Sequence, residues 1–154
     1  MYPKIHTNLT ELAFRIASSA HINQLDMAMK PYIEHPIRVA YNFDDEDRIV
    51  IGFLHDVVED THLTFEDLRH YGIPEYHIDI LRLLTRNKGE VYKDYIKRIA
   101  TNKVAIEVKL ADLSDNMRLD RLSNITAKDI NRIEKRYKPA FDFLSHELLK
   151  FDKS

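Results

Sequence analysis

Two adjacent pairs of ionisable residues stand in one apolar stretch of the sequence, IVIGFLHDVVED at residues 49–60. Seven of its first ten residues are large and apolar, which is typical of a helix that is buried on all sides. His55-Asp56 and Glu59-Asp60 would therefore be buried charges, and a buried charge without a partner is strongly destabilising. A divalent cation, bound by an imidazole and a carboxylate, would supply that partner.

The spacing of these residues supports the same chemistry. Glu59 and Asp60 each follow a member of the first pair by four residues, so in a helix they lie one turn further along the same face. Carboxylates at that position reach a water molecule on the metal, and the metal lowers the pKa of that water. A single His-Asp dipeptide is more often solvated or hydrogen-bonded, so the metal hypothesis depends on the apolar flanks and on the second acidic pair.

Two further segments carry residues that fit a metal site. In KPYIEHPIRVA, His35 directly precedes a proline that is well tolerated in a first helical turn, so its ring can project beyond the helix end. In KLADLSDNM, Asp112 and Asn116 form another pair four residues apart. Simpler interpretations are a capping or surface histidine in the first segment and an exposed helix face, including Lys109 and Asp115, in the second.

The elements that must position these residues are helices. Only three glycines and five prolines interrupt the chain, which favours long helices joined by short turns, and we predict an all-α fold. Residues 105–110 partly alternate, so a strand there is a minor alternative. Apolar spacing, capping residues and prolines predict helices over residues 10–20, from about 35, 45–58, 65–72, 74–85, 91–100, 102–116 and 126–149.

Composition restricts the class of protein. The 154 residues, 44% hydrophobic and 31% charged, predict a single globular domain over residues 1–154. Without cysteine, any metal must be bound by His, Asp or Glu. The net charge of −2 argues against nucleic-acid binding. No signal peptide or membrane span is evident, so we expect a cytoplasmic protein, and apolar helix faces leave a homo-oligomer open.

Four motifs in the family order make the sequence resemble the HD-domain phosphohydrolases, and among them the Rel/SpoT-like (p)ppGpp hydrolases. The matching segments are AH at residues 20–21, PYIEHPIRVA at 31–40, LHDVVEDT at 54–61 and VKLADLSDN at 108–116. The resemblance implies a compact HD-domain helical bundle. It commonly implies Mn²⁺, although two imidazoles and two carboxylates suit other divalent ions as well. The implied metal ligands are all present: His35, His55, Asp56 and Asp112.

The same resemblance assigns roles around the metal. Glu59 and Asp60 match the acidic pair that orients or activates the attacking water. Asn116 matches an asparagine near the substrate sugar and phosphates, and Tyr137 with Arg136 matches a late position that reaches the phosphate region. The implied reaction is hydrolysis at the ribose 3′ position of (p)ppGpp, which releases pyrophosphate and leaves GDP or GTP.

The remaining histidines divide into two groups. His21 matches a family histidine that is not a ligand, and we expect it to steady the site by hydrogen bonding. The others match nothing and are expected at the surface: His6, His62, His70, His77 and His146.

One position departs from the family pattern. Asp26 stands where an arginine of the alarmone hydrolases packs on guanine, and an aspartate cannot stack as a guanidinium does. It can accept hydrogen bonds from a base edge, so Asp26 is counted with Tyr32 of the PY motif as a substrate-binding residue. The alternatives are a hydrolase of another nucleotide or small phosphoester, and a regulatory metal-binding module without turnover, against which the Glu59-Asp60 pair argues. An HD nuclease is disfavoured because no basic surplus is present.

Overall fold

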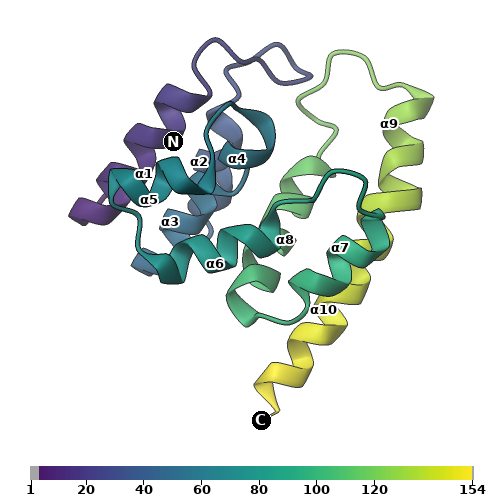
Figure 1. Ribbon diagram of the computed structural model, residues 1–154. Coiled ribbons are helices and arrows are strands. Elements are labelled where there is room, and N and C mark those ends of the chain that lie inside the picture. The colour runs from purple at the N-terminus through teal and green to yellow at the C-terminus, as the bar shows by residue number, and fades with distance from the viewer. Residues whose placement is uncertain (1–3, 154) are drawn as a thin grey trace.

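The computed structural model describes residues 4–153, and its regular elements there are helices (Figure 1). The all-α prediction is confirmed, and the alternative strand at residues 105–110 is wrong because that segment lies inside α8. Residues 1–3 and 154 of the predicted domain lie outside the described residues. None of the helices in the described part is long and apolar enough to cross a membrane. In chain order the elements are α1 (Asn8–Ala20), α2 (Glu34–Ala40), α3 (Glu46–Leu54), α4 (Val57–Asp60), α5 (Phe65–Tyr71), α6 (Glu75–Leu84), α7 (Tyr92–Ile99), α8 (Lys103–Asn116), α9 (Ala127–Arg132), the π-helix η1 (Ile133–Tyr137) and α10 (Lys138–Asp152).

Capping residues begin several helices where the sequence predicts them. Asp45 and Thr64 accept hydrogen bonds from the backbone N–H three residues further on, at the starts of α3 and α5. The N-cap of α1 is Thr7, three residues before the predicted start of this helix at residue 10. The Thr7 and Thr10 hydroxyls each accept a hydrogen bond from the other residue's N–H, so the helix begins earlier than the apolar spacing indicates.

The helix predicted over residues 45–58 is interrupted at the residues that matter most. α3 ends at Leu54, His55 and Asp56 form a turn, and the short α4 follows. The His55 ring donates to the Gly52 carbonyl at 2.7 Å, which is the oxygen that a continuous helix would offer to the N–H of Asp56. Glu59 and Asp60 therefore stand on a separate helical turn rather than on an extension of α3.

The helix predicted over residues 126–149 is also interrupted. It consists of α9, η1 and α10, and the Lys138 N–H donates to the Ile133 carbonyl in a π-helical step. Pro139 follows directly, and it has no N–H to give the Lys135 carbonyl. A π-bulge accommodates the missing hydrogen bond without ending the helix.

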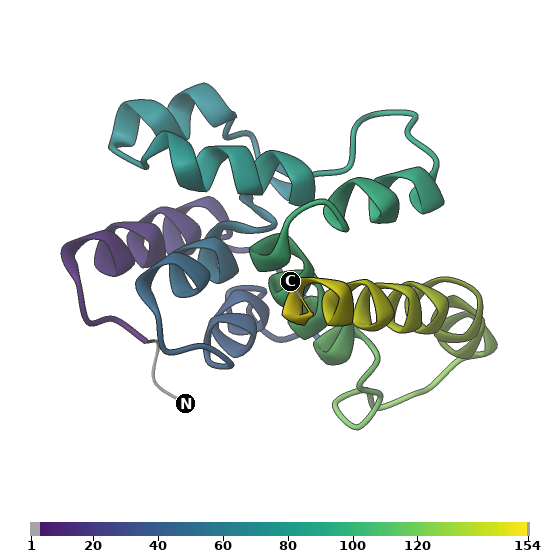
Figure 2. The ribbon, with the colours of Figure 1, turned by 90° about the horizontal axis from the view of Figure 1, so that it is seen from below.

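The centre of the fold is α3, which packs against α1, α2, α6 and α8. Its apolar residues Ile49, Val50, Ile51 and Phe53 are fully buried. Gly52 allows α2 to lie close, because a Cβ there would stand 3.0 Å from the Cα of Ala40. Figures 1 and 2 show α8 between the helices of the first half of the chain and α10, which runs along it. This packing brings α2, the end of α3 and α8 together.

Candidate metal centre and active site

Four side chains from three parts of the chain converge where these helices meet. One ligand atom from each lies within 4.8 Å of the others, an arrangement that could hold a divalent metal ion: His35 of α2, His55 and Asp56 of the turn after α3, and Asp112 of α8. The Nε2 atom of His35 is 2.9 Å from Asp112 Oδ1, and that of His55 is 3.1 Å from Asp56 Oδ2. Asp56 is half-buried and the other three are buried.

Hydrogen bonds on the far side of each imidazole fix its orientation. His35 Nδ1 donates to Asp115 Oδ2 at 2.6 Å, and His55 Nδ1 donates to the Gly52 carbonyl at 2.7 Å. These bonds place the ring protons on Nδ1, so both Nε2 lone pairs face the centre, where the two atoms are 3.2 Å apart. Two lone pairs and two carboxylates that meet at one point form a donor set that fits a divalent cation.

The electrostatics of the cluster favour positive charge at its centre. Burial would lower the pKa of His35 and of His55, but the neighbouring carboxylates, above all Asp112 and Asp56, raise the pKa of both imidazoles. The same field that favours a proton on an imidazole attracts a metal cation. The four side chains could therefore hold a cation as well as hydrogen-bond to one another.

The simpler interpretation of this segment, an exposed face of α8 that includes Lys109 and Asp115, is wrong: Asp115 is buried and Lys109 is half-buried beside the centre. Asp115 accepts two hydrogen bonds from Arg38, at 2.8 and 3.1 Å, in addition to the one from His35. Lys109 Nζ lies 2.8 Å from Asp112 Oδ2, and only 12% of its side chain is exposed. Burial would raise the pKa of Asp115, but its bonds to His35 and Arg38 hold it well below its usual range. The partners of Asp115 come from α2, which the sequence alone does not place there.

The two acidic residues of α4, Glu59 and Asp60, have different surroundings. Asp60 Oδ2 is 3.4 Å from the Tyr32 hydroxyl, which donates to Asp56 Oδ2 at 2.6 Å. Burial, together with the charges of Asp56 and Glu59, raises the pKa of Asp60 to about 6. Glu59 points elsewhere, because its Oε1 accepts a hydrogen bond from the Arg86 N–H at 2.7 Å. Asp60 is thus the carboxylate linked to the metal cluster through Tyr32.

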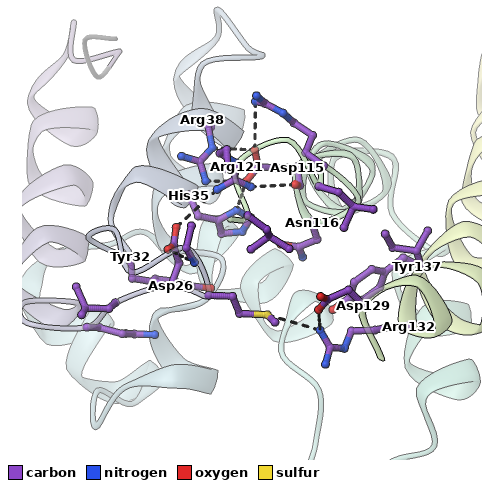
Figure 3. Close-up of a pocket in the computed structure, with 18 residues that line it drawn as sticks. Asp26, Tyr32, His35, Arg38, Asp115, Asn116, Arg121, Asp129, Arg132 and Tyr137 are labelled. Carbon is purple, nitrogen blue, oxygen red and sulfur yellow. Dashed lines mark hydrogen bonds and ion pairs between the residues drawn. The ribbon is translucent and has the colours of Figure 1, made fainter. Parts of the chain in front are cut away.

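A cavity of about 370 Å³ opens beside His35 of the cluster. Figure 3 shows the side chains that line it. The wall of this cavity includes four of the residues predicted to bind substrate: Asp26, Tyr32, Asn116 and Tyr137. Asn116 Nδ2 also donates to Asp112 Oδ1 at 3.1 Å. Arg136 does not line this cavity but lies over the Tyr92 ring, 4.8 Å from its centroid, in a second cavity that it shares with Glu59.

Asp26 is held in the wall by its own loop. Its Oδ1 accepts hydrogen bonds from the N–H groups of Ala28 and Lys30, at 2.8 and 3.0 Å. Its Oδ2 is buried without a hydrogen-bond partner and lies 3.6 Å from Arg121 Nη1. One oxygen of Asp26 therefore stabilises its own loop, while the other can still accept a hydrogen bond.

The histidines outside the cluster differ from the prediction at one position. His21 bonds Gln24 at 2.8 Å, and its ring packs against Tyr32 at 4.9 Å, so it supports a residue that touches Asp56. His77 was expected at the surface but is buried, with Nε2 2.8 Å from Asp47 Oδ1. This contact joins α6 to the start of α3. In the sequence, only the apolar neighbours of His77 indicated that it is buried.

Comparisons with known proteins agree with this geometry. No family model matches the sequence. A probable GTP pyrophosphokinase of Mycobacterium leprae is 33% identical over 132 residues, which cover 78% of this chain and 17% of the relative. A guanosine-3′,5′-bis(diphosphate) 3′-pyrophosphohydrolase of Haemophilus influenzae is 31% identical over 147 residues, 86% of this chain and 21% of the relative. The solved structure of a metazoan SpoT orthologue that hydrolyses ppGpp has a TM-score of 0.78 at 26% identity and covers 99% of this chain and 95% of its own.

Over most of its length the chain is similar to Rel/SpoT-like proteins, and its fold is similar to that of a metazoan SpoT orthologue. It spans about a fifth of the length of the two curated relatives described above. The Rel/SpoT resemblance and the HD-domain fold inferred from the sequence are both confirmed. Some neighbours of the site were not among the residues predicted from the motifs, namely Arg38, Arg86, Lys109, Asp115 and Arg121. Arg38, Lys109 and Asp115 had a signal in the sequence, since each lies three residues from a candidate ligand in the same helix.

Proposed function

We propose that this protein is a metal-dependent nucleotide phosphohydrolase, and specifically a (p)ppGpp 3′-pyrophosphohydrolase that yields pyrophosphate and GDP or GTP. The observation that carries the proposal is the cluster of His35, His55, Asp56 and Asp112, with both imidazole Nε2 atoms turned inward beside a cavity. Relatives that bear this activity in their names support the choice of substrate. A cytoplasmic location and the single domain over residues 1–154 stay predictions.

These four residues would hold the metal ion, and we propose Mn²⁺. When bound, such an ion supplies Lewis-acid activation of water and offsets negative charge on the leaving phosphate. The chain's own contribution is orientation: Asp115 and the Gly52 carbonyl keep both imidazoles in the tautomer that presents Nε2. The site is therefore preorganised before the substrate arrives.

We propose that Asp60 accepts a proton from the attacking water. It contacts the hydroxyl of Tyr32, which is itself bonded to the ligand Asp56, so it lies beside the metal cluster without belonging to it. A carboxylate with a pKa near 6 is ionised at neutral pH and is a better proton acceptor than an ordinary aspartate. Glu59, bonded to the Arg86 N–H, would act from the other side of α4.

Asp26 is the residue that we propose contacts the base of the nucleotide. Asp26 Oδ2 and Arg121 Nε are both buried without hydrogen-bond partners in the same cavity wall. A base edge that carries a donor beside an acceptor would satisfy both atoms. Guanine meets this condition through N1–H and O6, and adenine meets it through its amino group and N1. The second candidate function is therefore the same hydrolysis on a different nucleotide.

Metal content and turnover test the proposal separately. Purified protein should retain about one transition metal ion per chain, and His55→Ala or Asp112→Ala should release it, whereas His146→Ala at an exposed position should not. Elemental analysis measures this, and equal metal in all the variants would exclude the site.

Substrate is tested with a panel of ppGpp, other 3′-phosphorylated nucleotides, nucleoside monophosphates and cyclic dinucleotides in the presence of Mn²⁺. Pyrophosphate released from ppGpp alone is the expected result. Hydrolysis of a different member would assign the second candidate function. Metal binding with no turnover on any member would contradict catalysis and favour a regulatory module.

A further inference from the structure

A second cavity, of about 670 Å³, lies on the Glu59 side of the cluster and is lined by Arg86, Tyr92 and Arg136. We propose that this corner binds the diphosphate group that leaves the substrate. The inference rests on the proposed function and adds a subsite to it, with Arg86 and Tyr92 in roles that no motif assigns.

The charge of this corner is the first argument. Within residues 4–153, the arginines without a carboxylate oxygen in ion-pair distance are Arg82, Arg86 and Arg136. Two of these three, Arg86 and Arg136, each lie against the ring of Tyr92, at 5.5 and 4.8 Å from its centroid. Two guanidinium groups that share one aromatic ring and lack a counter-ion form a natural anion site.

The carboxylates of the corner already have hydrogen-bond partners other than the guanidinium groups of Arg86 and Arg136. Glu59 Oε1 accepts the Arg86 N–H, and Glu90 is bound by Arg98 at 2.6 and 2.8 Å. Arg86 Nε donates to the Glu90 carbonyl at 2.8 Å, which fixes the side chain while its terminal nitrogens make no hydrogen bond. Arg86 is therefore held in place with donors to spare, and planar donors of this kind match phosphate oxygens.

Tyr92 connects this corner to the metal cluster. Its ring lies 5.8 Å from that of Tyr95, which Lys109 Nζ covers at 5.2 Å, and Lys109 in turn bonds the ligand Asp112 at 2.8 Å. The hydroxyl of Tyr92 is buried and has no hydrogen-bond partner. A phosphate oxygen between the cluster and the arginines would accept the hydrogen bond that this hydroxyl has available.

The positions of the two cavities indicate which phosphate groups of the substrate bind beside Arg86 and Arg136. His35 lines the first cavity, while Glu59, one turn after the ligand Asp56, lines the second, so the cluster lies between them. Tyr137 and Arg136 divide in the same way, although they are adjacent in η1. With the nucleoside in the first cavity beside Asp26, cleavage at the cluster leaves the departing diphosphate on the side of Arg86 and Arg136.

Calorimetric titration of the metal-loaded protein with inorganic pyrophosphate tests the subsite, with GDP as the second ligand. Arg86→Gln and Arg136→Gln should each weaken pyrophosphate binding about tenfold and leave GDP binding unchanged. Arg82→Gln is the matched control, because Arg82 also lacks an acidic partner but lies over Phe65, 4.5 Å from its centroid. Pyrophosphate affinity equal to wild type in both variants would overturn the subsite, and so would a loss of GDP affinity in place of pyrophosphate affinity.

The readout distinguishes this inference from the proposed function. If ppGpp is not hydrolysed but pyrophosphate binding depends on Arg86 and Arg136, the substrate assignment fails and the subsite stands. If ppGpp is hydrolysed and both variants bind pyrophosphate normally, the subsite fails alone. Arg136 is exposed, so its substitution leaves the folded core intact, and Arg86→Lys, which keeps the positive charge, should restore part of the affinity lost in Arg86→Gln.

Discussion

At the scale of single residues, the metal cluster depends on a side chain that is not itself a ligand. Asp115 accepts the Nδ1 proton of His35 and is held by two arginines: Arg38 through two hydrogen bonds, and Arg121 through its backbone oxygen at 3.2 Å. Arg121 also approaches Asp26 at 3.6 Å. Arg121 therefore contacts both Asp26, in the wall of the nucleotide cavity, and Asp115, which orients His35.

Replacement of Asp115 by Asn should weaken the metal site while keeping its shape. The amide cannot stabilise the Nδ1–H of His35 as a carboxylate does, and such substitutions behind a ligand typically reduce metal affinity about 10–100-fold. Competition with a fluorescent chelator measures the affinity. Asp120→Asn, which removes an exposed partner of Arg118, should leave the affinity as in wild type. An unchanged affinity in Asp115→Asn would show that the orientation of His35 does not depend on this carboxylate.

Asp60 should set the acid limb of the pH profile. Its pKa is raised to about 6 by burial and by the charges of Asp56 and Glu59, and only its ionised form accepts a proton. The value of kcat/KM should therefore fall as the pH is lowered through about 6, or somewhat lower because a bound cation favours the ionised form. Asp60→Asn should lose most turnover yet keep its metal. An intact acid limb in the residual activity of this variant would transfer the role elsewhere.

The sequence predicted which side chains meet at the cluster, but not what surrounds them. His55 and Asp56 stood out because buried ionisable groups need partners, and the resemblance to the HD-domain motifs added His35 and Asp112. The burial of Lys109 depends on what packs against that face of α8, and no pattern within α8 contains this information. Asp26 is similar: its substitution is visible in the sequence, but its contact with Arg121 is not.

At the scale of elements, the crossing of α2 and α3 brings two ligands to one point. Gly52 lies at this crossing, and its carbonyl also accepts the Nδ1 proton of His55. The absence of a side chain there lets the backbone of α2 approach, which carries His35 toward the end of α3. One glycine thus serves both the packing of the helices and the orientation of a ligand.

Gly52→Ala should therefore reduce stability and metal affinity together. The added Cβ would stand 3.0 Å from the Ala40 Cα, and overpacking of this kind costs about 1–3 kcal/mol, more than the roughly 1 kcal/mol that alanine adds in helix propensity. Urea unfolding and chelator competition measure the two effects. Gly89→Asn is the control: its φ is 79°, a value that asparagine tolerates, and no atom lies near its Cβ position. Wild-type stability in Gly52→Ala would mean that α2 moves away freely.

The sequence predicted the elements well and their interruptions poorly. Helix starts follow from local capping chemistry, as Thr64 shows, so they can be found from the sequence. The break after Leu54 involves a side chain, His55, that takes a backbone carbonyl, and the π-helix at η1 results from Pro139. Apolar spacing passes through both places without change, so it predicts one continuous helix in each.

At the scale of the whole molecule, the metal cluster joins segments that are far apart in the chain. His35 and Asp112 are separated by 77 residues, and the contact between α2 and α8 closes this loop. The same region holds Arg38, Asp115 and Lys109 in one network. A cation bound there would therefore connect helices of the first half of the chain with α8, on which α10 packs, and its binding should be coupled to global stability.

Metal ions should raise the unfolding temperature by acting on the folded state alone. At 100 times the dissociation constant a ligand adds about 2.7 kcal/mol, which for a domain of this size corresponds to about 5–10 °C. Differential scanning calorimetry of metal-free protein with added Mn²⁺ should show this rise. In Asp112→Asn the rise should disappear while the protein stays folded, since Asn keeps the shape of the side chain. Asp142→Asn, at an exposed position of α10, should respond like the wild type. An equal rise in Asp112→Asn would mean that the stabilising ion binds away from His35, His55 and Asp56.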